Sequence, residues 1–272
     1  MKPIDCPNNV SVIIPVYEAA SFIVGTLETV AAQTLLPLEV VIIDDGSSDN
    51  TCDVIEAFSH ATPHLNIRLL REPHRGPGAA RNTGVVAANG DWIAFLDSDD
   101  LWKPQKLERM AVASQSMPDA NFLCHNEIHR YLDGSEHVVD YFLGYHLDRS
   151  LPEQLYKNNR FSTSAVICRK EPILSCGGFD NTFPNAQDYE LWLRMSPRIK
   201  VLFVTEVLGV YVDRTGNISS GRAWRRFKNV VRVLYRHRLK VGLYTRIMTL
   251  SRLLLSHCYR RILVSVKPKI SS

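Results

Sequence analysis

The sequence predicts an α/β protein built on a doubly wound, Rossmann-like and mostly parallel sheet. Short apolar stretches that suit buried strands alternate with segments of helical spacing over roughly the first hundred residues. Most of these apolar stretches end in polar or acidic loops. The order of elements changes after residue 103. We therefore expect a mixed second half, followed by a basic helical extension at the C-terminal end.

Each element follows from its local pattern. In the first half, the expected strands cover 10–15, 38–43, 67–70 and 92–96, with helices over 22–33, 50–58 and 79–88 between them. In the second half, we expect strands over 122–129, 164–169 and 201–211 and helices over 104–115 and 188–195. This divides the chain into a domain of residues 1–220, with halves of about 10–103 and 104–220, and an extension of 221–272.

Length and composition indicate an ordinary globular protein. A chain of 272 residues is long enough for one large domain with an appendage. The six cysteines form no Cys-x-x-Cys pair, which suggests thiols in a reducing compartment. Residues 1–9 lack the pattern of a signal peptide, and we expect none. Uninterrupted apolar stretches fall short of the ~20 residues that a membrane-spanning helix needs.

Charge is unevenly distributed along the chain. Residues 222–269 contain fourteen Lys or Arg and no Asp or Glu, whereas the rest of the chain has eighteen basic and twenty-eight acidic residues. Apolar residues recur in this tail at helical spacing, at Phe227, Val230, Val231 and Leu234 and again at Ile247, Leu250 and Leu254. The tail therefore either lies on an anionic membrane or packs on the acidic domain, and we favour the membrane. Because no recognised nucleic-acid-binding motif accompanies it, we expect no nucleic acid partner.

Three carboxylates follow the expected strand over 92–96, in the segment FLDSDD at 95–100. Like charges this close repel one another unless a cation neutralises them. Mg²⁺ and Mn²⁺ prefer such hard oxygen ligands, and Mg²⁺ is often held by one or two carboxylates plus substrate phosphates. Asp97 and Asp99 therefore suggest a site for a metal and a diphosphate. The alternative is an Asp-rich turn or a helix N-cap at Asp100.

Further polar residues fall in loops that a parallel sheet would bring to the same edge. Tyr17, Asp45, Asp97 and either Arg75 or Arg81 lie in or near these loops, and ligands of such sheets bind at this edge. The glycines of 76–78 suit a phosphate site, but the dinucleotide fingerprint Gly-x-Gly-x-x-Gly is absent after the first strand, which argues against a dehydrogenase. Asp188 suits a general base or a helix cap.

Taken together and in this order, six segments closely resemble glycosyltransferase family 2. They are VIIPVY at 12–17, DDGSSD at 44–49, ARNTG at 80–84, FLDSDD at 95–100, GGFD at 177–180 and QDYELW at 187–192. The resemblance covers about residues 10–219. It implies an inverting enzyme of the GT-A fold that uses a nucleotide-diphosphate sugar, with a nucleotide-binding first half and an acceptor-binding second half.

The resemblance also assigns roles to residues. It implies that Pro15, Tyr17 and Asp45 line the nucleoside pocket, with Glu18, Arg81 and Ser98 in the same nucleotide site. It places Asp97 near the ribose and diphosphate, Asp99 on the metal and Asp188 as the base.

Two positions depart from the family pattern. Gln187 stands where the family often has Glu, so an acidic neighbour that could raise the pKa of Asp188 is missing. Arg214 stands where many relatives have a His that contacts the metal or diphosphate. Because a charged guanidinium cannot ligate a metal, we expect Arg214 to contact the diphosphate instead.

The resulting expectation is a cytoplasmic enzyme, peripheral on the inner face of the cytoplasmic membrane. It would use Mg²⁺ or Mn²⁺ to transfer a sugar from a nucleotide donor to a hydroxyl of a glycan or lipid-linked acceptor, in cell-surface polysaccharide or lipopolysaccharide synthesis. The alternatives are a metal-dependent nucleotidyltransferase and a non-catalytic scaffold that binds nucleotide or membrane.

Overall fold

The computed structural model describes residues 9–214 and 223–266. The strands are β1 (Val10–Val16), β2 (Glu39–Asp44), β3 (Ile67–Arg71), β4 (Trp92–Phe95), β5 (Leu101–Trp102), β6 (Phe122–Arg130), β7 (Glu136–Val139), β8 (Val166–Arg169) and β9 (Val201–Val212). The α-helices are α1 (Ile23–Ala31), α2 (Thr51–Ala61), α3 (Pro77–Ala87), α4 (Lys106–Ser114), α5 (Leu151–Lys157), α6 (Lys170–Ser175), α7 (Gln187–Met195), α8 (Ala223–His237) and α9 (Leu243–Val266), with 3₁₀ turns η1 (Thr163–Ala165) and η3 (Arg238–Lys240).

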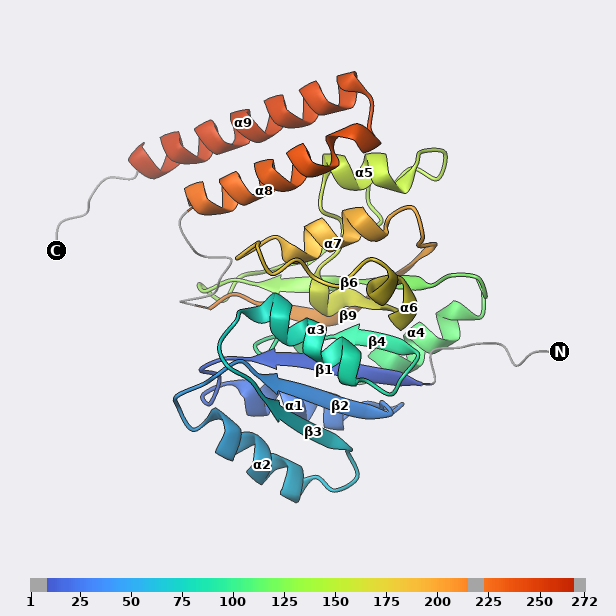
Figure 1. Cartoon of the computed structure of the whole chain (residues 1–272), viewed down its shortest axis with the longest axis vertical. Coiled ribbons are helices and arrows are strands. Elements are labelled where there is room, and N and C mark those ends of the chain that lie inside the picture. Colours follow the sequence, from blue (N-terminus) through green and yellow to red (C-terminus); the bar gives the residue numbers. More distant parts are fainter. Residues whose placement is uncertain (1–8, 215–222, 267–272) are drawn as a thin grey trace.

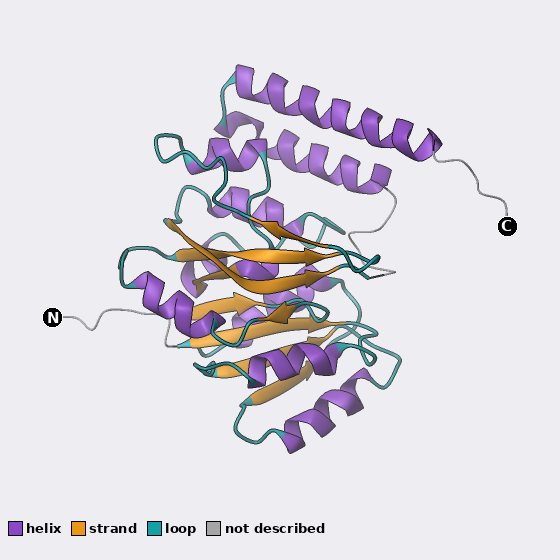
Figure 2. Cartoon of the chain, turned by 180° about the vertical axis from the view of Figure 1, so that it is seen from behind, coloured by secondary structure: helices purple, strands orange, loops and turns teal. Residues whose placement is uncertain are grey.

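One sheet runs through the molecule in the order β3-β2-β1-β4-β8-β6-β9-β5, and β7 pairs with β6 (Figures 1 and 2). The strands β3, β2, β1 and β4 are parallel, as predicted for the first half. The second half is mixed: β8 is antiparallel to β4 and β6, whereas β6 and β9 are parallel. The strand order reverses at β1, since the chain moves outward to β2 and β3 and then returns to β4 on the other side. Ligands of such sheets bind beside this reversal, outside the carboxyl ends of the strands.

A hydrophobic cluster lies on each face of the sheet. Val12, Ile14 and Ile42 point to one face and pack with α1, while Ile13 and Ile43 point to the other and pack with α3. This alternation is expected of strands covered on both faces. Helix α3 can approach the sheet closely because Gly84 has no side chain. A Cβ at this position would collide with Ile13.

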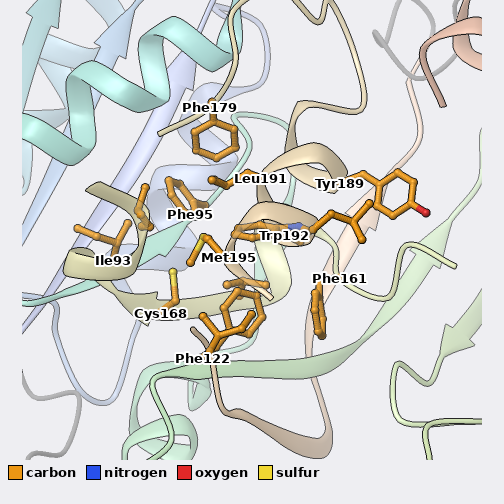
Figure 3. Packing of buried hydrophobic residues seen from close by; sticks show 14 of the residues in the cluster. Ile93, Phe95, Phe122, Phe161, Cys168, Phe179, Tyr189, Leu191, Trp192 and Met195 are labelled. Carbon is orange, nitrogen blue, oxygen red and sulfur yellow. The ribbon is translucent and has the colours of Figure 1, made fainter. Parts of the chain in front are cut away.

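The larger cluster extends into the second half of the chain (Figure 3). Trp192 of α7 is fully buried and packs edge-on against Phe122 of β6, with ring centroids 5.2 Å apart. Phe95 at the end of β4 meets Phe179 edge-on at 5.4 Å. These aromatic contacts fix α7 over the carboxyl end of β4. The start of α7 is therefore held near the expected carboxylate site.

The C-terminal extension is helical, as predicted, and its two helices lie side by side (Figure 1). Val233 and Leu234 of α8 are buried within the larger cluster, so α8 packs on the domain. Within the part of the chain that the structure describes, no helix is long and apolar enough to cross a bilayer.

Candidate active site

The β1, β2 and β4 loops meet where the strand order reverses. Asp45 follows β2 and is buried, with its two carboxylate oxygens each accepting a hydrogen bond of 2.8 Å, from the backbone N–H groups of Arg75 and Gly76. His74 Nδ1 lies 2.9 Å from Asp45 Oδ2. Asp45 therefore holds the loop before α3 against the sheet edge. Either Arg75 or Arg81 was expected at this edge of the sheet. The side chain of Arg75 pairs with Glu72, whereas Arg81 reaches the carboxylate of Asp97.

An aromatic surface lies beside Asp45. The ring of Tyr17 is 4.3 Å from that of His74, and Tyr17 is 48% exposed. Such a half-exposed ring can stack on a nucleobase. Pro15 is buried inside β1, opposite Ile43. Sequence reasoning did not single out His74, although it stands next to the arginine and glycines that were considered.

Glu18 ties two loops together. Its Oε1 accepts hydrogen bonds of 2.8 Å from both the N–H and the hydroxyl of Ser48, and its own N–H donates to Ser47 Oγ at 2.9 Å. Its backbone has a φ of 50°, which is uncommon for a residue other than glycine. The carboxylate and the N–H of Glu18 thus join the loop after β1 to the loop after β2.

Arg81 and Asp97 form an ion pair of 2.5 Å at the centre of the site. The guanidinium of Arg81 lies 5.5 Å from the centroid of the Phe179 ring, and its side chain is only 9% exposed. Its Nε is buried and has no hydrogen-bond partner among the described residues. The Arg81 side chain thus reaches Asp97 from a nearly buried position.

Asp99 lies between like and opposite charges. Burial and the charge of Asp97 raise its pKa to about 6, while Arg214 and Arg81 act in the opposite direction. The guanidinium of Arg214 lies 4.7 Å from the centroid of the Phe22 ring. The structure therefore brings Asp97, Asp99, Arg81 and Arg214 into one charged cluster. The carbonyl of Ser98 accepts a hydrogen bond of 2.7 Å from Thr26.

Asp100 is not a helix cap, so that prediction is wrong, whereas the Asp-rich turn does form, with the N–H of Asp100 donating to the carbonyl of Asp97 at 3.1 Å. Residues 101–102 form β5, and α4 begins only at Lys106. The buried carboxylate of Asp100 accepts hydrogen bonds from Ser164 Oγ at 2.6 Å and from the N–H of Val212 at 3.0 Å. Asp100 thus joins the carboxylate loop to the end of β9, which leads to Arg214.

Ser164 is a second residue that the sequence did not reveal. Its hydroxyl accepts a hydrogen bond of 3.1 Å from the N–H of Asp97 and donates one to the carboxylate of Asp100. Its carbonyl accepts a hydrogen bond of 2.6 Å from the fully buried Lys106, whose ammonium lies 3.6 Å from the centroid of the Trp102 ring. Burial lowers the pKa of Lys106 well below its usual range. No local pattern signals these contacts, because they join residues about sixty positions apart.

Asp188 stands in the first turn of α7 and is half-buried. The residue at the N-cap is Ala186, in a left-handed conformation with a φ of 59°, so Asp188 does not occupy the cap itself. Burial raises the pKa of Asp188, whereas the hydrogen bond that Asn159 Nδ2 donates to it at 3.1 Å acts to lower this pKa. The charges of Arg81 and Asp97 also influence this pKa, so Asp188 shares the site with them.

Gln187 fixes the start of α7 against the start of α3. It is buried and donates a hydrogen bond of 2.5 Å to the carbonyl of Phe183, and a Cβ at Gly78 would lie 2.7 Å from its Oε1. Asn82 of α3 holds the preceding loop through hydrogen bonds of 2.7 and 2.8 Å with the N–H and carbonyl of Phe179. Gln187 therefore has a packing role, and burial raises the pKa of Asp188 without an acidic neighbour at position 187.

The family model of glycosyl transferase family 2 matches residues 11–178, and the chain belongs to this family. It therefore carries a glycosyl transferase family 2 domain. A glycosyltransferase of Nostoc sp. is 38% identical over 131 residues, which are 48% of this chain and 39% of that protein. Chondroitin synthase of Escherichia coli is 31% identical over 69% of this chain and 26% of its own length. The chain thus spans well under half the length of these two relatives.

A relative of similar length acts in polysaccharide biosynthesis. The amylovoran biosynthesis glycosyltransferase AmsB of Erwinia amylovora is 28% identical over 222 residues, covering 78% of this chain and 73% of that protein. Two solved structures share the fold. TarS of S. aureus in complex with UDP-GlcNAc has a TM-score of 0.72 at 22% identity, over 96% of this chain and 76% of that chain. A mannosyltransferase of Pyrobaculum calidifontis in complex with GDP-Man and Mn²⁺ has a TM-score of 0.64 at 20% identity. The match covers 96% of this chain and 81% of that chain. The GT-A fold expected from the sequence is confirmed.

Proposed function

We propose that this glycosyltransferase moves a sugar from a nucleotide-diphosphate donor to a hydroxyl of a glycan or lipid-linked acceptor, with inversion at the anomeric carbon. We place the reaction in the synthesis of a cell-surface polysaccharide or lipopolysaccharide. The observation that carries the proposal is the position of Asp188, which shares one site with Arg81 and Asp97 and has a raised pKa. The polysaccharide function of AmsB supports the product class.

The donor nucleotide would bind at the carboxyl ends of β1 and β4. Tyr17 offers its exposed ring to the base, and the loops held by Glu18 and Asp45 shape the pocket around it. Pro15, Ser98 and Asp97 complete the proposed nucleotide-binding set. The guanidinium of Arg81, which already pairs with Asp97, suits a diphosphate oxygen, because a guanidinium pairs well with phosphate. The bound UDP-GlcNAc and GDP-Man of the two similar structures support this donor class.

The donor atoms around Asp99 fit Mg²⁺ or Mn²⁺. Asp99 and Asp97 offer hard carboxylate oxygens in one cluster. The described residues contain no group of three or more His, Cys, Asp or Glu side chains that could hold a metal, so the donor diphosphate would complete the coordination. A bound metal would supply positive charge to the leaving diphosphate. Arg214 would supply further charge from the end of β9 without ligating the metal.

Asp188 would act as the general base. Its carboxylate takes the proton of the acceptor hydroxyl as the acceptor oxygen bonds to the anomeric carbon. The bond between that carbon and the diphosphate oxygen breaks in the same displacement, and a nucleoside diphosphate leaves. Attack from the face opposite to the leaving group inverts the configuration. Burial of Asp188 brings its pKa closer to neutral pH, where a base is most effective.

Product analysis tests the reaction class. The protein is incubated with a panel of nucleotide sugars, Mg²⁺ or Mn²⁺ and candidate acceptors. Release of nucleoside diphosphate and an inverted anomeric centre by NMR would support the proposal. Release of pyrophosphate would favour a nucleotidyltransferase, and nucleotide binding without turnover across the panel would favour a scaffold. A retained anomeric configuration would overturn the base mechanism.

We also propose a cytoplasmic location, peripheral on the inner face of the membrane, where a lipid-linked acceptor is accessible. The described cysteines Cys52, Cys124, Cys168 and Cys176 are free thiols, which suits a reducing compartment. We propose that residues 221–272 provide the membrane contact. Nucleic acid is not among the proposed partners.

A further inference from the structure

The two C-terminal helices use their side chains differently, and α8 is committed to the domain. His237 and Arg236 both contact the buried carboxylate of Glu190, at 3.3 and 3.1 Å, and Arg236 also pairs with Asp180. The guanidinium of Arg232 lies 4.3 Å from the centroid of the Phe183 ring. Together with buried Val233 and Leu234, these contacts make α8 part of the folded body.

The inward side of α9 carries two buried threonines. Thr245 and Thr249 are 7% and 8% exposed, and the hydroxyl of Thr245 lies 3.3 Å from Glu153 of α5. Residues three and four positions apart share one face of a helix, so 245, 249 and 253 form the inner face. An ordinary surface helix buries its apolar side. Leu253 packs against the larger cluster, but the two threonines leave the inner face of α9 less apolar than its outer face, which is the reverse of an ordinary surface helix.

The outward side of α9 is apolar. We define the α9 apolar face as the residues of this helix that are large, apolar and between 37% and 76% exposed: Leu243, Tyr244, Ile247, Met248, Leu250, Leu254 and Leu255. Ser251 is the polar residue within this arc, and Arg252 is exposed at its border. Figures 1 and 2, seen from opposite sides, both show α9 as the outermost layer. A continuous apolar strip of this kind on a surface marks an interaction site.

The charge around the strip identifies the kind of partner. The sequence of α9 contains four arginines and no acidic residue, and Arg252 is exposed at the border of the strip. A second copy seated on the strip would bring two such segments together, and their like charges would repel. An anionic lipid surface instead offers negative headgroups to the basic residues and acyl chains to the apolar strip.

We propose that the α9 apolar face docks this protein on an anionic lipid bilayer. The proposal rests on the proposed function in taking the membrane of a lipid-linked acceptor as the occupant. Docking does not require α9 to cross the bilayer. The helix lies along the interface and inserts its outward side chains. The corresponding face of α8 is unavailable because it is buried against the body.

Cosedimentation of the full chain with vesicles tests the proposal. The vesicles contain phosphatidylcholine alone or equal parts of phosphatidylcholine and phosphatidylglycerol. We expect binding to the anionic vesicles, weakening as salt is raised, and much weaker binding to the neutral ones. The double variant Ile247→Glu/Leu254→Glu should bind at least about tenfold more weakly, since it removes two inserting side chains and adds two negative charges. Both residues are about half exposed, so the fold should be retained.

A matched control carries the same change in charge elsewhere. Val112→Glu/Leu174→Glu alters exposed apolar residues of α4 and α6, 52% and 45% exposed, and should bind like the wild type. The proposal is overturned if the wild type ignores anionic vesicles at low salt, if the α9 variant still binds like the wild type, or if sedimentation shows a dimer that this variant dissociates. Because the readout is binding, it is independent of turnover. Loss of vesicle binding with intact transfer to a soluble acceptor would refute docking alone, and vesicle binding without any transfer would refute the reaction alone.

Discussion

The substitution Asp188→Asn tests the assignment of the base most directly. It preserves the size of the side chain and replaces a carboxylate that can accept a proton with an amide that cannot. The amide oxygen can still accept the hydrogen bond from Asn159, now 3.1 Å long. Ala186 occupies the N-cap, and the Asp188 carboxylate accepts a hydrogen bond from the backbone N–H of Tyr189 in the first turn of α7, which an amide oxygen can also accept. We therefore expect a folded protein with its donor site intact.

We expect Asp188→Asn to lower the turnover number strongly and the affinity for the nucleotide sugar only slightly. A positioned general base contributes about 10²- to 10⁴-fold to a rate, which corresponds to roughly 2.7 to 5.5 kcal/mol of activation free energy. The KM for the nucleotide sugar should change little, since Arg81, Asp97 and Asp99 are untouched. The pKa of Asp188 is raised in the folded protein, so ionising it near neutral pH disfavours folding. The Asn variant should therefore be as stable as the wild type or slightly more so.

The assay is a pH series of kcat for the wild type and variants, with Tm measured in parallel. Activity needs the ionised base, so the wild-type rate should fall as the pH drops through the raised pKa of Asp188. The variant Asn159→Ala removes a hydrogen bond that favours the charged form, and its acidic limb should move to higher pH. A wild-type kcat in Asp188→Asn, or an acidic limb that Asn159→Ala leaves in place, would refute the assignment.

Three further predictions concern the surrounding charges. Asp99→Asn should abolish turnover in a folded protein, and full wild-type activity in excess chelator would contradict a metal role. Asp100→Ala removes two buried hydrogen bonds and should lower the free energy of unfolding in urea by about 2 to 4 kcal/mol. Asp119→Ala, at an exposed ion pair, is the control and should change it by under about 1 kcal/mol. Although burial opposes it, hydrogen bonds from His237, Arg194 and Arg236 lower the pKa of Glu190 from 4.5 to about 2. That stabilisation is present above about pH 4.5 and is lost towards pH 2, by up to roughly 3 kcal/mol. In acid titrations Glu190→Gln should lack this component, and equal acid sensitivity of the two proteins would contradict the role of Glu190.

The sequence by itself determined the first half of the fold and the carboxylate cluster. Strands β1, β2 and β4 are short and buried on both faces, and β3 is a half-buried strand beside them, so local pattern is enough to find them. The loops that follow them meet at one edge because parallel strands share a direction. Asp45, Asp97 and Asp99 could therefore be placed together before their neighbours were known. The basic tail could also be identified, since charge is a property of composition.

The tertiary structure decided what lies between these landmarks. The sequence did not reveal β5, β7, α5 or α6, which are two to seven residues long and too short for a clear period. It could not assign Asp100, whose carboxylate meets Ser164 and Val212 from strands and turns far along the chain. It also could not divide the tail into a packed α8 and an outward-facing α9, because both helices carry apolar residues at helical spacing. Which side of an amphipathic helix is buried depends on the surface it meets, and that surface exists only once the chain has folded.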